Sequence, residues 1–310
     1  MKITVIGAGN VGATVADCVA QKDMASEVVI IDIVDGLPQG KALDIQEAAP
    51  IHGFDTRVIG TNDYADTAGS DICIITAGSP RKPGMSRDDL LSINAKIVKS
   101  VTEQFVVHSP DAILIIVSNP LDVMTYVAYI TSGFPSKRVM GMAGVLDTAR
   151  FRAFLAVELN VSVRDIQALL MGGHGDTMVP LPRYTTVGGI PVTEMIGEDE
   201  LTAIVNRTKT GGGEIVKLMG TSAWYAPGAA AAEMAEAIVK DSGRVLPAAA
   251  WLSGQYGLNE LFIGVPVRLG REGIKEVVGV QLDASEKSLL DASAEHVRVN
   301  LAALERLNVI

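Results

Sequence analysis

The chain has 310 residues, 48% of them hydrophobic, and a formal net charge of -10. This composition excludes a disordered chain and is typical of one large or two ordinary globular domains. The acidic balance argues against a nucleic-acid partner, and no apolar run reaches membrane-spanning length. A strand pattern begins directly at Lys2, and both cysteines, Cys18 and Cys73, lie in apolar patterns. We therefore expect no signal peptide, no membrane anchor and buried free thiols in a reducing, cytoplasmic compartment.

The N-terminus carries a dinucleotide-binding pattern. An apolar strand at 2–6 runs into a G-x-G-x-x-G motif, and helix-period residues follow at 11–20. The first glycine allows a tight turn, the second lets pyrophosphate approach the backbone, and the third lets the helix pack on the sheet. The predicted phosphate-binding residues are Gly7, Ala8, Gly9, Asn10, Val11 and Gly12.

The acid that completes this pattern ends the next strand. Asp32 follows the apolar run 28–31 and stands twenty residues after Gly12, where it can accept hydrogen bonds from ribose hydroxyls. A tight strand–helix turn would explain the glycines but not Asp32. The carboxylate would repel a 2′-phosphate, and Ile33 and Val34 offer no arginine to hold one. The sequence therefore predicts NAD, not NADP, as the cofactor.

Two arginines lie in a loop after another apolar strand. The strand pattern at 71–78 leads into residues 79–89, where prolines and a glycine prevent regular structure and Ser86 marks a helix start. Arg81 and Arg87 follow a strand's carboxyl end, which is where open α/β sheets bind ligands. A solvated basic loop is the alternative. Because the chain as a whole is acidic, two arginines close together in one loop favour an anion-binding site there.

A further strand, 112–117, ends in Ser118-Asn119-Pro120. The amide of Asn119 could bond ribose, nicotinamide or substrate, and an Asx-type turn before proline is the alternative. Asp147 and Arg150 stand three residues apart, so on a helix they would share one face. They are either a surface ion pair or a pair in which Asp147 orients a histidine and Arg150 clamps a carboxylate.

His174 stands in the segment Gly172-Gly173-His174-Gly175-Asp176, after a predicted strand at 166–171. Glycines on both sides let the backbone bend and leave the imidazole open to a ligand, as general acid–base chemistry requires. A loop histidine beside an ordinary turn is the alternative. The other histidines are predicted to be structural or exposed, and these are His52, His108 and His296.

The order of elements predicts an α/β fold with two parts. Strict strand–helix alternation up to residue 143 predicts a Rossmann domain with a parallel sheet, and residues 144–310 an α+β catalytic domain. The remaining predicted elements are a helix at 36–50 ended by Pro50, a hairpin at 188–191, helices at 198–218 and 227–241, strands at 244–252, 262–269 and 277–282, and a helix from Ala284 onward.

Taken together, these motifs resemble the lactate/malate dehydrogenase family, in the family's order and over nearly the whole chain. The resemblance implies reversible NAD-dependent oxidation of malate to oxaloacetate, as in the tricarboxylic acid cycle, and assembly into dimers or tetramers. It implies no metal. It assigns acid–base catalysis to His174 with Asp147 as its partner, substrate contacts to Arg81, Arg87, Asn119 and Arg150, and cofactor contacts to Asn94, Val117 and Asn119.

Two alternatives stay open beside this interpretation. The first is another 2-hydroxyacid dehydrogenase, chiefly one that acts on lactate. Lactate dehydrogenases carry glutamine where this chain has Arg81, so the arginine favours a substrate with a second carboxylate. A non-enzymatic NAD-sensing protein would not need the set of His174, Asp147 and Arg150.

The helices at 37–49 and 228–241 present small or apolar faces, and with the resemblance they favour a homotetramer over a dimer.

Overall fold

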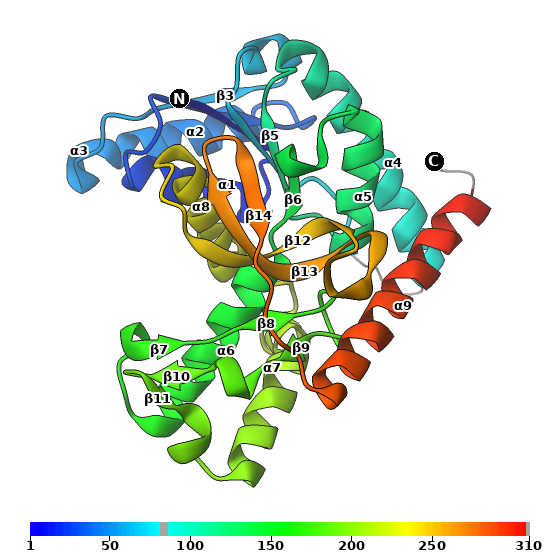
Figure 1. Ribbon diagram of the computed structural model, residues 1–310. Helices are drawn as coiled ribbons and strands as arrows, with labels where there is room; N and C mark the ends of the chain where they lie inside the picture. Colours follow the sequence, from blue (N-terminus) through cyan, green and yellow to red (C-terminus); the bar gives the residue numbers. More distant parts are fainter. Residues whose placement is uncertain (81–85, 308–310) are drawn as a thin grey trace.

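The computed structural model describes residues 1–80 and 86–307, with only the backbone of Arg87. Its elements alternate as the sequence predicts (Figure 1). The strands are β1 (Lys2–Ile6), β2 (Glu27–Ile31), β3 (Arg57–Thr61), β4 (Ile72–Ile75), β5 (Ile113–Ile116), β6 (Val139–Gly141), β7 (Ile166–Gln167), β8 (Leu170–Met171), β9 (Val179–Pro180), β10 (Thr186–Val187), β11 (Ile190–Pro191), β12 (Val245–Ser253), β13 (Asn259–Gly270) and β14 (Gly273–Val277). The helices are α1 (Asn10–Gln21), α2 (Leu37–Glu47), α3 (Ala49–His52), α4 (Arg87–His108), α5 (Leu121–Ser132), α6 (Ala143–Leu159), α7 (Glu198–Met219), α8 (Tyr225–Val239) and α9 (Ala284–Arg306).

A nine-stranded sheet organises the described residues, in the order β14-β13-β12-β6-β5-β4-β1-β2-β3. The strands from β3 to β6 in this order pair in parallel, and β12 to β14 extend the sheet antiparallel. The chain reverses its winding direction between β1 and β4, and open α/β sheets generally bind ligands at the carboxyl ends of the strands at such a point. The predicted fold, a Rossmann domain with a parallel sheet followed by an α+β catalytic domain, is confirmed.

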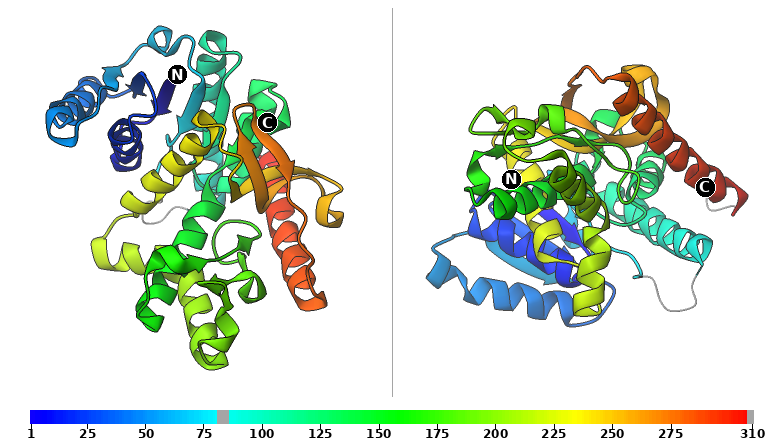
Figure 2. Two further views of the ribbon diagram at one scale, coloured as in Figure 1. Left: turned by 60° about the vertical axis from the view of Figure 1, so that its left-hand side comes forward. Right: turned by 90° about the horizontal axis from the view of Figure 1, so that it is seen from below.

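The continuous apolar strands reflect burial on both faces of the sheet. Successive side chains of a strand point to opposite faces, so Ile72 and Ile74 of β4 join one core while Cys73 and Ile75 join another. Helices α1 and α8 cover the first face, and α4 and α5 cover the second. The long helix α9 runs along the outside of the molecule in all three ribbon views (Figures 1 and 2). Both faces of the parallel strands are therefore closed, which leaves their ends for chemistry.

Helix α6 joins the sheet to a smaller lobe, drawn at the bottom of Figure 1. Its first turns pack on the sheet through Val145 and Leu146, and its later turns pack through Phe151 and Leu155 into a third core. That third core also takes in residues of β7, β8 and α7. Residues 147–150 consequently lie where α6 passes from one core to the other.

Several predicted boundaries are wrong. The single strand predicted at 166–171 is two short strands, β7 and β8, which pair with different partners. The chain stays helical past Pro50 as α3, because proline is tolerated in a first turn. The third late strand is β14, which ends where the prediction at 277–282 begins. Val280 and Leu282 pack against the core from an irregular segment, so their apolar character reflects burial, not pairing.

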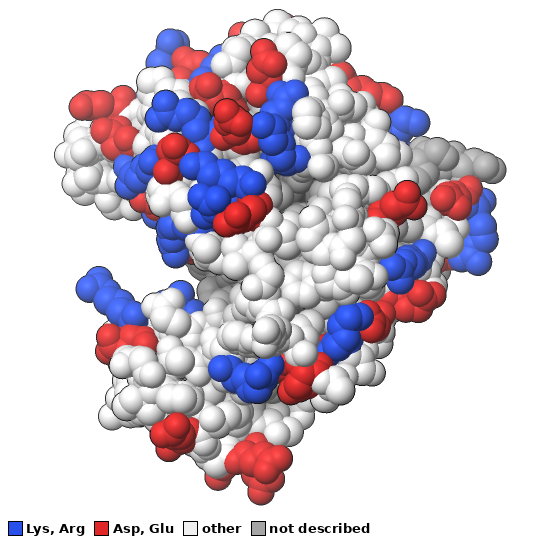
Figure 3. Space-filling view, in the orientation of Figure 1, with Lys and Arg blue, Asp and Glu red and all other residues white. Residues whose placement is uncertain are grey.

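The surface carries charges of both signs. On the face shown in Figure 3, Lys and Arg side chains lie among Asp and Glu side chains, and much of the centre is uncharged. Among the described residues, no helix has the length and apolar character needed to cross a membrane. Both cysteines are free; Cys73 is buried as predicted, and Cys18 is only partly buried.

Candidate active site

The glycine motif forms the turn between β1 and α1. Gly7 has φ +106°, a conformation that other residues rarely adopt. A Cβ atom at Gly12 would lie 1.8 Å from the carbonyl oxygen of Gly7, so only glycine allows this close packing. A Cβ at Gly9 would meet no atom within 4 Å. The outer glycines thus shape the turn, and the middle one faces the open space that a pyrophosphate would need.

Asp32 lies against this turn. Its Oδ2 accepts a hydrogen bond from the backbone N–H of Ala8 at 2.7 Å, and its Oδ1 accepts one from Val34 at 3.0 Å. The parallel register of β1 and β2 causes this proximity, because both strands end at the same edge of the sheet. An acid beside the glycine turn is the arrangement expected for the ribose and pyrophosphate of the predicted cofactor, NAD.

Asn94 connects the loops that follow β4 and β5. Its side chain is buried in α4, where Oδ1 accepts from the N–H of Ser79 at 2.7 Å. Its Nδ2 donates to the carbonyl oxygen of Asn119 at 2.8 Å. Val117 is buried, whereas Asn119 is exposed. Asn94 therefore fixes the two loops on the predicted cofactor side.

A buried carboxylate lies between the predicted catalytic histidine and the predicted substrate-binding arginine. Oδ2 of Asp147 lies 2.9 Å from Nδ1 of His174, and its Oδ1 lies 3.3 Å from Nη1 of Arg150. The side chain of Asp147 is 3% exposed, so this is not the surface ion pair of the alternative interpretation. With Nδ1 held by the carboxylate, Nε2 of His174 is the ring atom left for proton exchange.

The environment raises the pKa of His174 above its ordinary value. Burial by itself disfavours the charged ring and lowers the pKa. The charge and hydrogen bond of Asp147, and the charge of Asp122, act in the opposite direction and outweigh burial and the nearby Arg150. A protonated imidazole is thus stabilised at this position.

The backbone of the His174 loop is attached to three elements. Gly172, with φ +86°, exchanges hydrogen bonds with Gly264 of β13 at 2.8 and 3.1 Å. The N–H of Gly173 donates to Oγ of Ser293 in α9 at 2.8 Å. The N–H of His174 donates to Oδ2 of Asp122 in α5 at 3.0 Å. These attachments fix the direction of the ring.

A cavity of about 250 Å³ opens beside His174. Asn119 lines it from the β5–α5 connection and Asp122 from the first turn of α5, and His296 and Asn300 line it from α9. The prediction that His296 is exposed is wrong, since its side chain is half-buried in this wall. The proposed proton-transfer group therefore lies beside a cavity with a partly polar lining.

Of the two arginines predicted in the loop, the structure describes only the backbone of Arg87. Arg81 lies outside the described residues. Arg87 is the first residue of α4 and directly follows Ser86, which caps the helix. The side chains of Ser86 and Asp89 each accept a hydrogen bond from the backbone N–H of the other. The prediction that Ser86 starts a helix is confirmed.

The described geometry agrees with the comparisons with known proteins. Residues 1–141 match the family model for the lactate/malate dehydrogenase NAD-binding domain, and residues 144–307 match that for the alpha/beta C-terminal domain of the same family. The chain belongs to the lactate/malate dehydrogenase family. The predicted resemblance is confirmed, and the chain is an NAD-dependent dehydrogenase.

Individual relatives cover nearly the whole chain. A malate dehydrogenase of Salinibacter ruber is 71% identical over 307 residues, which span 99% of this chain and 98% of the relative. A crystal structure of malate dehydrogenase from Salinibacter ruber, 69% identical, superimposes with a TM-score of 0.96 over 99% of this chain and 98% of that one. A lactate dehydrogenase of Cryptosporidium parvum, complexed with lactic acid and NAD, is 41% identical with a TM-score of 0.94 over 98% of each chain.

Two residues of this dehydrogenase site escaped the sequence analysis. Asp122 looks like an ordinary acid in a helix's first turn, where acids are common. Its position two residues after Pro120, at a strand's carboxyl end, was the available signal. Gly211, in the middle of α7, lies where a Cβ atom would be 2.4 Å from Cδ of Arg150, and it could be found only by asking why a helix interior contains glycine.

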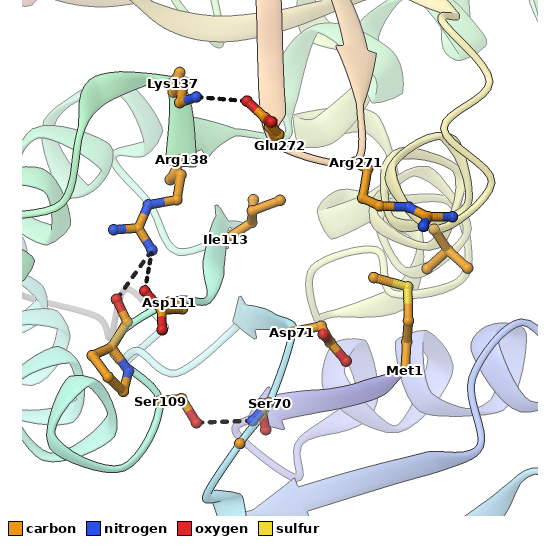
Figure 4. A pocket seen from close by; sticks show the side chains of 13 residues that line it. Met1, Ser70, Asp71, Ser109, Asp111, Ile113, Lys137, Arg138, Arg271 and Glu272 are labelled. Carbon is orange, nitrogen blue, oxygen red and sulfur yellow. Dashed lines mark hydrogen bonds and ion pairs between the residues drawn. The ribbon is translucent and has the colours of Figure 1, made fainter.

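A second cavity, of about 840 Å³, lies at the opposite end of the parallel strands (Figure 4). Two of the cations that line it have polar partners. Lys137 bonds Glu272 at 2.8 Å, and Arg138 donates to the carbonyl oxygen of Pro110 at 3.0 Å. None of the predicted site residues in the described part of the chain lines it.

Proposed function

We propose that this dehydrogenase oxidises malate to oxaloacetate reversibly, with His174 as the acid–base residue. The carrying observation is that one buried carboxylate, Asp147, contacts both His174 and Arg150. A proton-transfer group and a carboxylate-binding group are thus fixed relative to each other. High identity to malate dehydrogenases supports the choice of substrate.

The proposed chemistry follows from these contacts. Arg150 holds the carboxylate beside the reacting carbon through two parallel hydrogen bonds. As the hydride leaves that carbon, Nε2 of His174 takes the hydroxyl proton, and the charge of Asp147 stabilises the resulting imidazolium. NAD, when bound, supplies the hydride acceptor. In the reverse direction, protonated His174 returns the proton to the carbonyl oxygen of oxaloacetate.

The remaining roles are proposed from the resemblance together with the geometry. The glycine motif from Gly7 to Gly12 and Asp32 would hold the phosphates and the ribose of NAD. Asn94, Val117 and Asn119 would form its nicotinamide side, with Asn119 also contacting substrate. Residues 1–143 would act as the cofactor domain and residues 144–310 as the catalytic domain. We also propose a cytoplasmic location and a place in the tricarboxylic acid cycle.

Arg81 is proposed to select the dicarboxylate, and Arg87 to polarise the substrate carbonyl. Every 2-hydroxyacid has the carboxylate that Arg150 binds, so Arg150 cannot discriminate between oxaloacetate and pyruvate. Pyruvate lacks the second carboxylate, so with pyruvate bound Arg81 would have no anionic partner. An enclosed charge without a partner costs about 2–5 kcal/mol. This corresponds to a preference for oxaloacetate of roughly 30- to 5,000-fold.

Kinetics with two substrates test this proposal. We expect kcat/KM of NADH oxidation to be far higher with oxaloacetate than with pyruvate. Arg81→Gln should lower the first value and raise the second, with an unchanged Kd for NADH. A wild-type preference for pyruvate would overturn the malate assignment. An unchanged substrate ratio in Arg81→Gln would remove Arg81 from specificity and leave the assignment to the relatives alone.

A further inference from the structure

The middle of α7 contains three consecutive glycines, Gly211, Gly212 and Gly213, within a helix of 22 residues. Glycine is less favourable than alanine inside a helix, because it loses more conformational freedom on folding. A run of three therefore calls for a reason in the surrounding structure.

The surroundings supply such a reason for the first of them. Gly211 is buried, and a Cβ atom there would lie 2.4 Å from Cδ and 2.9 Å from Nε of Arg150. At Gly212 the nearest atom is Nη2 of Arg150, at 4.0 Å, and at Gly213 no atom lies within 4 Å. Only Gly211 makes room for the arginine.

Other contacts of Arg150 come from the same two helices. Its Nη1 lies 3.3 Å from Oδ1 of Asp147 in α6 and 3.5 Å from the carbonyl oxygen of Thr208, one turn before Gly211 in α7. The side chain is 11% exposed. A methyl group at position 211 would displace this flexible side chain and leave the backbone of α7 in place. The consequence would fall on the guanidinium, not on the fold.

We infer that Gly211 is a positioning residue, whose missing side chain sets the orientation in which Arg150 meets the substrate carboxylate. This inference rests on the proposed role of Arg150. Two parallel hydrogen bonds to a carboxylate require a fixed guanidinium plane. A displacement of about 1 Å at such a site lowers the rate roughly 100-fold.

The test compares Gly211→Ala with its matched control Gly213→Ala. For Gly211→Ala we expect a raised KM for oxaloacetate, kcat/KM lowered about 100-fold, an unchanged Kd for NADH and a Tm no lower than wild type. Gly213→Ala should leave the kinetics unchanged and raise the Tm slightly, because alanine favours the helix. Loss of packing alone would instead lower the Tm and leave KM unchanged.

A double variant separates a role through Arg150 from a direct one. In an Arg150→Gln background, Gly211→Ala should lower kcat/KM no further. A wild-type KM in Gly211→Ala, an equal loss in both backgrounds, or lost NADH binding would overturn the inference. The proposed function fails separately, if the wild type does not turn over oxaloacetate. Gly211 would then be tested with pyruvate, which carries the same carboxylate.

Discussion

At the scale of single residues, the sequence predicted His174, Asp147 and Arg150 as one set because each residue type suits one task. It also predicted Asp147 as the partner of His174 and on one helix face with Arg150, but it could not predict the packing that brings His174 to this face. That arrangement depends on α6 passing from one core to another, and on a loop held by β13, α5 and α9. Spacing along the chain carries no information about such distant contacts, so Asp122 and Gly211 were missed.

Asp122 gives the first prediction. Burial raises its pKa to about 6, and no described residue bonds its buried Oδ1. The ionised carboxylate helps to raise the pKa of His174, and Asp147 from α6 and Arg150 also act on that ring. The cavity further brings Asp88 of α4, Asp176 of the histidine loop and His296 of α9 close to it.

Asp122→Asn keeps an acceptor for the N–H of His174 but removes the charge. The pKa of His174 should therefore fall, because a negative charge that favours the protonated ring is lost. Oxaloacetate reduction needs the protonated ring, so its activity declines as pH rises through this pKa, and in the variant that decline should begin at lower pH. A pH profile of kcat/KM measures it. An unshifted profile with intact activity would show that Asp122 acts only on the backbone.

At the scale of elements, the apolar periodicity predicted the parallel strands and the long helices, since two buried faces leave a strong pattern. It failed where packing without pairing produced the same pattern, as in the irregular segment with Val280 and Leu282. It also failed at β7 and β8, because a run of apolar residues does not reveal a change of partner strand.

The connection between the β4 and β5 loops gives the second prediction. Asn94→Ala would leave the N–H of Ser79 and the carbonyl oxygen of Asn119 without their side-chain partner, a net loss of about 0.5–1.5 kcal/mol for each hydrogen bond. We expect a raised Kd for NADH and a lower Tm. Gln104→Ala, on the exposed face of the same helix with only local bonds to Ser100, is the control. Equal NADH affinity in both variants would speak against this role.

At the scale of the whole molecule, the exposed apolar residues predict self-association. Leu43 of α2, Ile51 of α3 and Tyr225 of α8 are 61%, 85% and 72% exposed, and an assembly that covered these side chains would remove apolar surface from water. With the family resemblance, this favours a homotetramer over a dimer. Light scattering at micromolar concentration should give a multiple of 32.6 kDa. The monomer mass would end the proposal.

The whole-molecule account depends on one pair, His174 and its buried partner Asp147. Single-turnover oxidation of bound NADH by oxaloacetate in His174→Asn tests this pair most directly. The account predicts a hydride-transfer rate lowered by about 10²–10⁴-fold, with the fluorescence-measured Kd for NADH unchanged. A wild-type rate in this variant would contradict the assignment of proton transfer to His174.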